Sequence, residues 1–283
     1  MKSIKQRFDL TTYEDRSWFK RFLARLRILT YTHRALPSFL IIGAQKAGTT
    51  SLYRYLAKHP NIKPNFVVKE LSFFDEYYNR GLPWYKSHFP FKRQTKQYFE
   101  GTTHYLFNPL APQRIKEVLP NVKVIALLRN PIDRAYSSYK HQVRAQRETL
   151  SFEEAIAAEV QRLAGEKERL LTEPDYISYN YNHFSYLERG KYSEQIQNWL
   201  THFPREQMLI LSSDGFFQDT EVSLNKIYNF LGIEPAKINI KKQYNTGNYK
   251  DAMPENTRTY LQQYYQPYNQ ELQKILGVDF HWS

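Results

Sequence analysis

The sequence contains no cysteine. Disulfide bonds and cysteine-ligated metals are therefore excluded, and we expect a reducing compartment, the cytoplasm. The sequence also lacks any run of about 18 apolar residues, the length that a membrane-spanning helix needs. Hydrophobic residues make up 41% and charged residues 24% of the 283 positions, a balance typical of globular proteins. This length suffices for one large α/β domain or two small ones.

Acidic residues are outnumbered by basic ones. With 40 Lys and Arg against 28 Asp and Glu, the formal net charge is +12. Such a charge favours nucleic acid, an acidic polysaccharide, an anionic membrane or a multiply charged cofactor as partner, or else serves only to keep the surface soluble. Residues 1–34 form a polar, basic arm. Within it, Trp18–Leu29 predicts a basic amphipathic helix that packs on a protein surface or makes a weak contact with a membrane surface.

After Pro37 the pattern changes to strands that alternate with helices. Short apolar runs predict three buried parallel strands: Phe39–Ile42, Val122–Leu128 and Met208–Leu211. Helices are expected before Pro60, after Asn130-Pro131, and over 151–171, Glu194–Phe203 and Val222–Leu231. This alternation predicts a single α/β domain over residues 35–283, with helices on both faces of a central parallel sheet. We expect the first two strands to be neighbours at its centre.

The segment Gly43–Thr50, with the sequence GAQKAGTT, lies between the first strand and a helix. At such a junction, backbone N–H groups and the helix dipole bind phosphate. Its two glycines flank four residues, as in a Walker A loop, but that loop continues with Lys and then Ser or Thr. Here Thr49 and Thr50 follow, and Lys46 lies inside the loop. The segment predicts a P-loop-like anion site without the magnesium apparatus of ATP hydrolysis, and a purely structural turn is the alternative.

Arg129 directly follows the strand Val122–Leu128, at the end of the sheet where ligands bind in open α/β folds. Ser137 lies about two helical turns further on. A guanidinium suits a phosphate monoester, and a hydroxyl can donate to another of its oxygens. Anion sites at two strand ends predict a cofactor that carries a 5′ diphosphate-like group and a separate 3′-phosphate. An ion pair between Arg129 and an acidic neighbour is the alternative.

These two segments resemble those of a known enzyme family. Gly43–Thr50 resembles the 5′-phosphosulfate loop of sulfotransferases that use 3′-phosphoadenosine-5′-phosphosulfate (PAPS), and residues 128–138 resemble their 3′-phosphate segment. The resemblance covers roughly residues 38–282 and includes Lys69-Glu70. The chain is most similar to the branch that sulfates carbohydrates, with the sulfotransferase half of heparan N-deacetylase/N-sulfotransferases and soluble bacterial relatives. It lacks the loop Pro and Trp of the branch that acts on phenols and steroids.

The resemblance implies an enzyme that transfers a sulfuryl group from PAPS to a hydroxyl or amine of a carbohydrate or glycoconjugate, releases PAP, and needs no metal. By the same resemblance, Glu70 is the general base and Lys46 stabilises the leaving 5′-phosphate. The implied cofactor-binding residues of the two segments are Lys46, Ala47, Gly48, Thr49, Thr50, Arg129 and Ser137.

The chain departs from the family pattern at two places. Glu100 is followed by Gly101, where related enzymes often carry Lys. The late loop that binds the 3′-phosphate is usually Lys-Gly-Arg-like, whereas this chain reads TGNYK over 246–250. Only Gly247 matches that pattern, and Lys250 is the nearest cation. We carry these two residues over as candidate 3′-phosphate ligands.

Other interpretations stay open at this point. Glu70 could merely pair with Lys69, in which case Glu100 and His104 are the next candidates for the base. A nucleotide kinase is excluded, because it requires Lys at position 49 and an Asp at a strand end. The alternative function is a basic nucleic-acid- or membrane-binding module with a degenerate phosphate loop. No compact Lys/Arg cluster with interleaved aromatic residues lies beyond the arm, so we expect no nucleic-acid partner.

Overall fold

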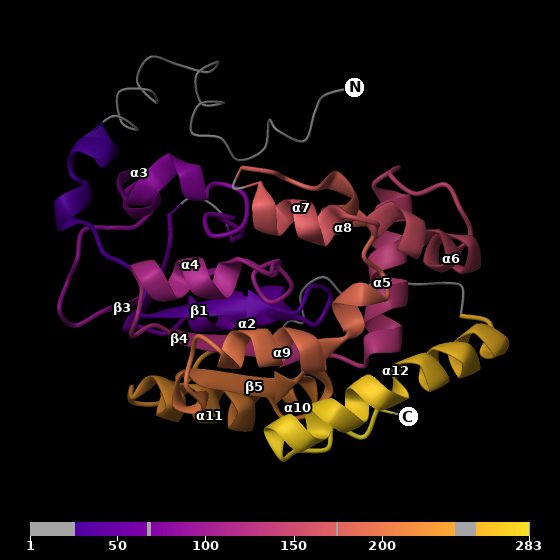
Figure 1. Cartoon of the computed structure of the whole chain (residues 1–283). Helices are drawn as coiled ribbons and strands as arrows, with labels where there is room; N and C mark the ends of the chain where they lie inside the picture. The colour runs from indigo at the N-terminus through magenta and orange to yellow at the C-terminus, as the bar shows by residue number, and fades with distance from the viewer. Residues whose placement is uncertain (1–25, 67–68, 174, 241–252, 283) are drawn as a thin grey trace.

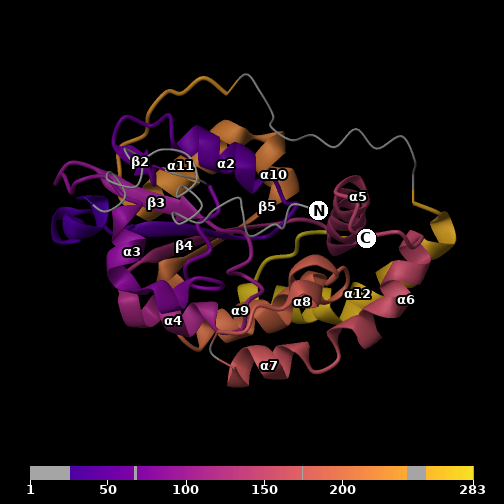
Figure 2. The ribbon, with the colours of Figure 1, turned by 90° about the horizontal axis from the view of Figure 1, so that it is seen from above.

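The computed structural model describes residues 26–66, 69–173, 175–240 and 253–282. They form a sheet with helices on both faces, so the predicted α/β architecture with a central parallel sheet is confirmed (Figure 1). Helices α2, α10 and α11 lie on one face of the sheet, and α4 and α9 lie on the other (Figure 2). Helices α5, α6 and α12 lie beyond the carboxyl ends of the strands (Figure 1).

The sheet has five strands in the order β2-β3-β1-β4-β5, and every neighbouring pair is parallel. The strands are β1 Phe39–Gly43, β2 Ile62–Pro64, β3 Gln97–Gly101, β4 Lys123–Leu128 and β5 Met208–Ser212. All residues of β1 and all but the first of β4 are buried. Because both faces of these strands are covered, their sequences are continuous apolar runs rather than alternating ones. The prediction that the first and second expected strands are central neighbours is confirmed.

Helices lie in the connections between the strands and also follow the last strand, β5. The α-helices are α2 Thr49–Leu56, α3 Gly81–Ser87, α4 Ala111–Val118, α5 Pro131–Arg144, α6 Phe152–Leu163, α7 Glu166–Thr172, α8 Tyr179–His183, α9 Tyr192–Leu200, α10 Ser213–Gln218, α11 Thr220–Leu231 and α12 Glu255–Leu276. Short 3₁₀ helices span Tyr31–His33, Tyr78–Arg80, Glu188–Gly190 and Arg205–Gln207.

Helix boundaries follow the expected capping signals, with one correction. The Asn130 side chain accepts a hydrogen bond from the Ile132 amide at the start of α5, and Ser151 forms a capping box with Glu154 at the start of α6. The single helix expected over 151–171 is wrong, because it is two helices, α6 and α7. Gly165 separates them in a left-handed conformation with φ of 73°, which a continuous helix cannot contain.

The described part of the basic arm packs on the domain. Residues 26–29 are helical, and Arg34 is buried, with its Nη1 donating to the Phe89 carbonyl over 2.8 Å. The rest of the helix predicted over Trp18–Leu29 lies outside the described residues. Within the described residues, none of the helices has the length and apolar content needed to traverse a bilayer.

Candidate active site

The phosphate loop lies at the carboxyl end of β1 and leads directly into α2. Gly48, the last residue before α2, has φ of +89°, and a Cβ at this position would lie 2.6 Å from the Phe217 ring of α10. Both facts require glycine here. The Ala47 carbonyl accepts a hydrogen bond of 2.9 Å from the Ser213 hydroxyl, so the loop is also tied to the start of α10. The loop is thus held on a rigid part of the fold.

The two predicted phosphate segments meet at the same end of the sheet. Since β1 and β4 are parallel neighbours, their carboxyl ends lie side by side. Arg129 Nη1 donates to the Lys46 carbonyl over 3.3 Å, and the Tyr192 hydroxyl donates to the Arg129 carbonyl over 3.1 Å. The predicted juxtaposition of the two segments is confirmed. Among the described residues, Arg129 contacts the phosphate loop and has no acidic side chain as an ion-pair partner.

Cations crowd around the loop lysine. Burial, and after it the positive charges of neighbouring side chains, lower the pKa of Lys46 to about 8. Those neighbours, in decreasing order of effect, are Arg144, Arg129, Arg134 and Lys69. Like charges placed this close are unfavourable in the absence of an anion. The cluster therefore matches a ligand that carries several negative charges.

One face of α5 supplies much of this cluster. Arg134, Ser137, His141 and Arg144 follow each other at spacings of three, four and three residues, which places them on one side of a helix. Arg134 and Ser137 are buried. Arg134 Nη2 donates to the Tyr186 carbonyl, while its Nε and Nη1 have no partner among the described residues. The sequence interpretation selected Ser137 but missed Arg134 and Arg144, which the same helical spacing identifies.

The predicted base lies next to the loop. Lys69 Nζ is 3.1 Å from Thr49 Oγ1 and 3.2 Å from Glu70 Oε1, so one ammonium links the first residue of α2 to the carboxylate. The Thr103 hydroxyl donates to the same Glu70 oxygen over 3.0 Å. The Glu70 side chain is 40% exposed, which leaves room for a substrate. Thr50 follows Thr49 in α2 and is half-buried.

The second candidate base, Glu100, lies in a closed environment. Its side chain is fully buried, and the hydroxyls of Tyr85 and Tyr105 each donate to its Oε1 over 3.0 Å. Burial raises the pKa of Glu100 to about 8. The third candidate, His104, lies with its Nε2 3.3 Å from Gln45 Nε2 of the loop, and burial lowers its pKa. Of the three candidates, Glu70 is the one whose carboxylate is open to solvent beside the loop.

Within the described ranges, one group of side chains has the composition of a metal site. The candidate ligand atoms of Asp75, Glu76 and His104 lie within 4.8 Å of one another. Asn182 already donates to Glu76 over 3.1 Å, and Gln45 contacts His104. Burial raises the pKa of both carboxyl groups, which opposes the charged forms that bind a cation. The expectation that the reaction needs no metal stays a prediction.

Two predicted cofactor residues, Gly247 and Lys250, lie outside the described residues. Their contact with a 3′-phosphate stays a prediction.

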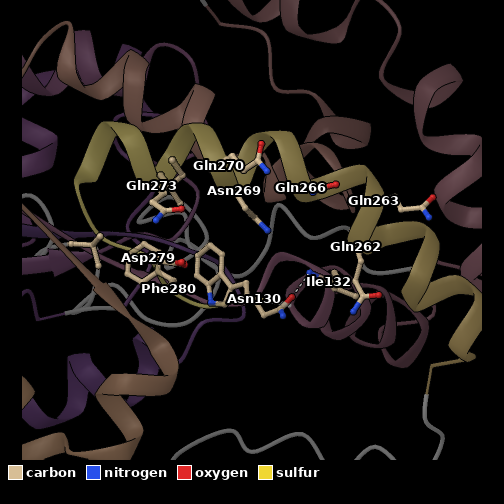
Figure 3. Close-up of a pocket in the computed structure, with 13 residues that line it drawn as sticks. Asn130, Ile132, Gln262, Gln263, Gln266, Asn269, Gln270, Gln273, Asp279 and Phe280 are labelled. Carbon is tan, nitrogen blue, oxygen red and sulfur yellow. Dashed lines mark hydrogen bonds between the residues drawn. The ribbon is translucent and has the colours of Figure 1, made fainter.

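A pocket of about 380 Å³ lies beside the cofactor segments but differs from them in chemistry. Asn130 and Ile132 contribute to it from the start of α5, and Gln262 and Asn269 extend towards them from α12 (Figure 3). The residues described around it include several amides and Asp279 but no Lys or Arg. Such a lining suits uncharged polar groups and does not match the phosphates of a nucleotide.

Comparison with known proteins places the chain in a family. The family described as "Sulfotransferase domain" matches residues 36–280. The bifunctional heparan sulfate N-deacetylase/N-sulfotransferase 1 of Xenopus tropicalis is 32% identical over 278 residues, and enzyme 3 of this type from Homo sapiens is 31% identical over 275 residues. Each alignment covers 85% of this chain, but the chain spans only 30% of the length of either relative.

A solved structure extends the similarity to the fold. The crystal structure of a sulfotransferase from Alicyclobacillus acidocaldarius is 31% identical to this chain, with a TM-score of 0.65. The match covers 87% of this chain and 98% of the other. Because the family match spans residues 36–280, which include both phosphate segments, the chain belongs to the sulfotransferase domain family. The predicted resemblance to the heparan N-sulfotransferase-like branch of PAPS-dependent enzymes is confirmed.

Proposed function

We propose that this protein transfers the sulfuryl group of PAPS to a hydroxyl or amine of a carbohydrate or glycoconjugate and releases PAP. The observation that carries this proposal is the cation cluster around Lys46, at the point where the phosphate loop and Arg129 meet. PAPS carries a phosphosulfate on the 5′ side and a phosphate on the 3′ side, so one ligand would satisfy both segments. Relatives that are heparan sulfate N-sulfotransferases support a carbohydrate acceptor.

In this proposal the donor is held by the loop and by α5. The amides of Ala47 and Gly48 and the hydroxyls of Thr49 and Thr50 would bind the phosphosulfate at the N-terminus of α2. Lys46 would stabilise the negative charge that develops on the leaving 5′-phosphate. The 3′-phosphate would be bound separately by Arg129 and Ser137, with Gly247 and Lys250 as further candidates.

The acceptor is activated at the half-exposed carboxylate. Glu70 would take the proton from the acceptor O–H or N–H as the new bond to sulfur forms and the bond between sulfur and the bridging phosphate oxygen breaks. General base catalysis of this kind contributes roughly 10²–10⁴-fold. Lys69, which contacts both Thr49 and Glu70, would hold the carboxylate towards the end of the phosphosulfate. This function fits the loop better than a nucleic-acid- or membrane-binding module, because α5 and the loop concentrate charge in one place.

The proposal is tested with the full chain and PAPS that carries a sulfur radiolabel, incubated with glycans, glycolipids and phenols in parallel. We expect label in a glycan fraction and PAP as the second product. Transfer to phenols alone would contradict the acceptor assignment, and no transfer with no PAPS binding would contradict the function. The cytoplasmic location stays a prediction, which fractionation of the producing cells would test.

A further inference from the structure

A second basic region lies away from the phosphate loop, at the edge strand β2. It is a groove of about 870 Å³, a size typical of ligand sites. Three separate segments form it, around positions 27–34, 63–66 and 90–98. The residues that line this β2 groove are Arg27, Arg34, Lys63, Pro64, Asn65, Phe66, Pro90, Phe91, Arg93, Lys96 and Tyr98.

The charged side chains that line the β2 groove are all basic. Five of the lining side chains described are Arg or Lys, and none of them is acidic. Lys63 and Arg93 are exposed, without a side-chain hydrogen bond or ion pair to another described residue. Residues 1–25 of the chain carry seven Lys and Arg against three Asp and Glu, so charge does not favour the basic arm as the occupant. The groove therefore matches an anion from outside the chain.

Two aromatic rings face solvent in the same groove. Phe66 is 62% exposed and Phe91 is 54% exposed, which is unusual for rings of this size. Arg27 lies over the Phe66 ring at 5.0 Å, and Arg34 lies over the Phe91 ring at 4.7 Å. Both guanidiniums also donate to backbone carbonyls, Arg27 to Ser87 and Arg34 to Phe89, so they hold the rings in place and add positive charge. The exposed Lys63 and Arg93 are the cations open to anionic oxygens. Flat apolar surface next to fixed cations suits a ligand of rings that carry acidic groups.

A buried amide at the floor of the groove points to a ligand independently. Asn65 is only 4% exposed, and its Oδ1 accepts a hydrogen bond of 2.9 Å from the Tyr53 hydroxyl. Its Nδ2 is buried and has no acceptor among the described residues. A buried donor without a partner costs about 1–3 kcal/mol, so such groups are rare unless something else binds them. A hydroxyl, carboxylate or sulfate oxygen in the groove would satisfy it.

The β2 groove is close enough to Glu70 for one ligand chain to reach both. Asn65 and Lys69 both lie beside β3, since the Asn65 amide donates to the Phe99 carbonyl and the Gly101 amide donates to the Lys69 carbonyl. Five residues of extended chain span at most about 18 Å. A polymer of a few rings that is bound in the groove can therefore place a later ring at Glu70.

We propose that the β2 groove binds a segment of an acidic polysaccharide, with carboxylate or sulfate groups on the cations and sugar faces on the exposed rings. The groove would hold the acceptor chain outside the catalytic centre. Its role in presenting the acceptor rests on the proposed function, whereas the binding itself does not. An anionic lipid shares the negative charge but lacks the polar ring faces that Asn65 and the aromatic residues would contact.

The test compares two double variants of the full chain. Lys63→Ala/Arg93→Ala removes two exposed cations of the groove, and Lys167→Ala/Lys226→Ala removes two exposed cations from α7 and α11. Fluorescence anisotropy at 0.15 M salt measures the affinity of each for a labelled heparin octasaccharide, for dextran, and for vesicles that contain phosphatidylserine. We expect heparin affinity to fall at least about tenfold in the groove variant only, since hydrogen bonds to charged groups are lost.

Three results would overturn the proposal: equal heparin affinity in the two variants, dextran binding as tight as heparin binding, or an effect of the groove variant that is larger on vesicles than on heparin. Asn65→Asp adds an independent readout, because a carboxylate in place of the buried amide donor should repel the anion and weaken heparin binding further. Calorimetry with PAP separates the two proposals. If PAP fails to bind the wild type, the proposed function fails, while the heparin result still decides the groove.

Discussion

The residues around the phosphate loop and those around Glu70 differ in how firmly the fold encloses them. Ala47 in the loop and Thr49 at the start of α2 are buried, and Arg129 directly follows β4, the neighbour of the central strand β1. Glu70 belongs to no helix or strand, and its side chain is 40% exposed. The phosphate loop and Arg129, here called the donor side, are thus built into the core. The acceptor side, which is Glu70 and its surroundings, lies on a loop. Loops tolerate change more easily than core strands, so the fold constrains the donor more than the acceptor.

The largest effect is expected from a substitution that removes the proposed base on the acceptor side and leaves the donor side intact. Glu70→Gln keeps the size of the side chain but removes the proton acceptor, so kcat should fall by roughly 10²–10⁴. The affinity for PAP should change less than about twofold, because in the proposed function Glu70 acts on the acceptor and not on the nucleotide. Turnover of labelled PAPS and PAP calorimetry measure the two quantities, with Glu168→Gln, an exposed residue of α7, as the matched control.

Nearly full turnover in Glu70→Gln would place the base elsewhere. Glu100 and His104 would then be tested next.

The next largest effect is expected from a substitution on the donor side. Lys46→Ala removes the cation that we propose for the leaving 5′-phosphate, and loss of one such group costs about 10²–10³-fold in kcat. Unlike Glu70→Gln, this change should also weaken PAP binding. Lys226→Ala on α11 removes an equal charge from an exposed site and serves as the control. If PAP affinity in Lys46→Ala equals that of the control, the loop lysine does not bind the donor.

A smaller effect would distinguish contacts with the 3′-phosphate of the donor from contacts with its 5′ side. Arg129→Ala should weaken PAP binding by about 2–3 kcal/mol, which is roughly 30- to 150-fold, because the 3′-phosphate loses a charge-assisted contact. AMP lacks this phosphate, so its affinity should change little and provides the internal control. An equal loss for both nucleotides in calorimetric titrations would show that Arg129 acts on the loop, through its bond to the Lys46 carbonyl, and not on the 3′-phosphate.

The smallest effect concerns pH. Burial and neighbouring cations lower the pKa of Lys46 to about 8, so in the free protein this lysine loses its charge as pH rises through about 8. A bound anion favours the charged form and raises the pKa again. PAP binding near pH 8 should therefore take up a proton, and affinity should fall few-fold above that pH. Calorimetry in two buffers with different ionisation enthalpies measures the uptake.

Lys46→Ala should abolish this uptake. Uptake of the same size in that variant would assign the proton to another group.

The strands and the position of the phosphate loop could be predicted from the sequence for a physical reason. A strand that is buried on both faces must be an apolar run, and a loop that binds phosphate at a helix N-terminus needs glycine at positions such as Gly48. Both signals are local in the sequence. The break between α6 and α7 was missed, because Gly165 is a single residue in an otherwise helical pattern.

Features that depend on tertiary contacts could not be predicted from the sequence. The Lys69 ammonium joins Thr49 to Glu70, which are 21 residues apart, only because the loop folds against α2. Arg134 and Arg144 face the loop because α5 starts at the carboxyl end of β4, although their spacing from Ser137 was visible. The β2 groove combines three segments that are distant in the sequence, and no sequence motif indicates that they come together.

The proposed function depends most on the claim that the donor side binds a nucleotide with phosphates on both the 5′ and the 3′ side. Calorimetric titration of the wild-type protein with PAP and with AMP tests this claim directly. We predict that PAP binds at least about 30-fold more tightly than AMP, because Arg129 and Ser137 are the proposed ligands of the extra phosphate. Equal affinities for the two nucleotides would contradict it.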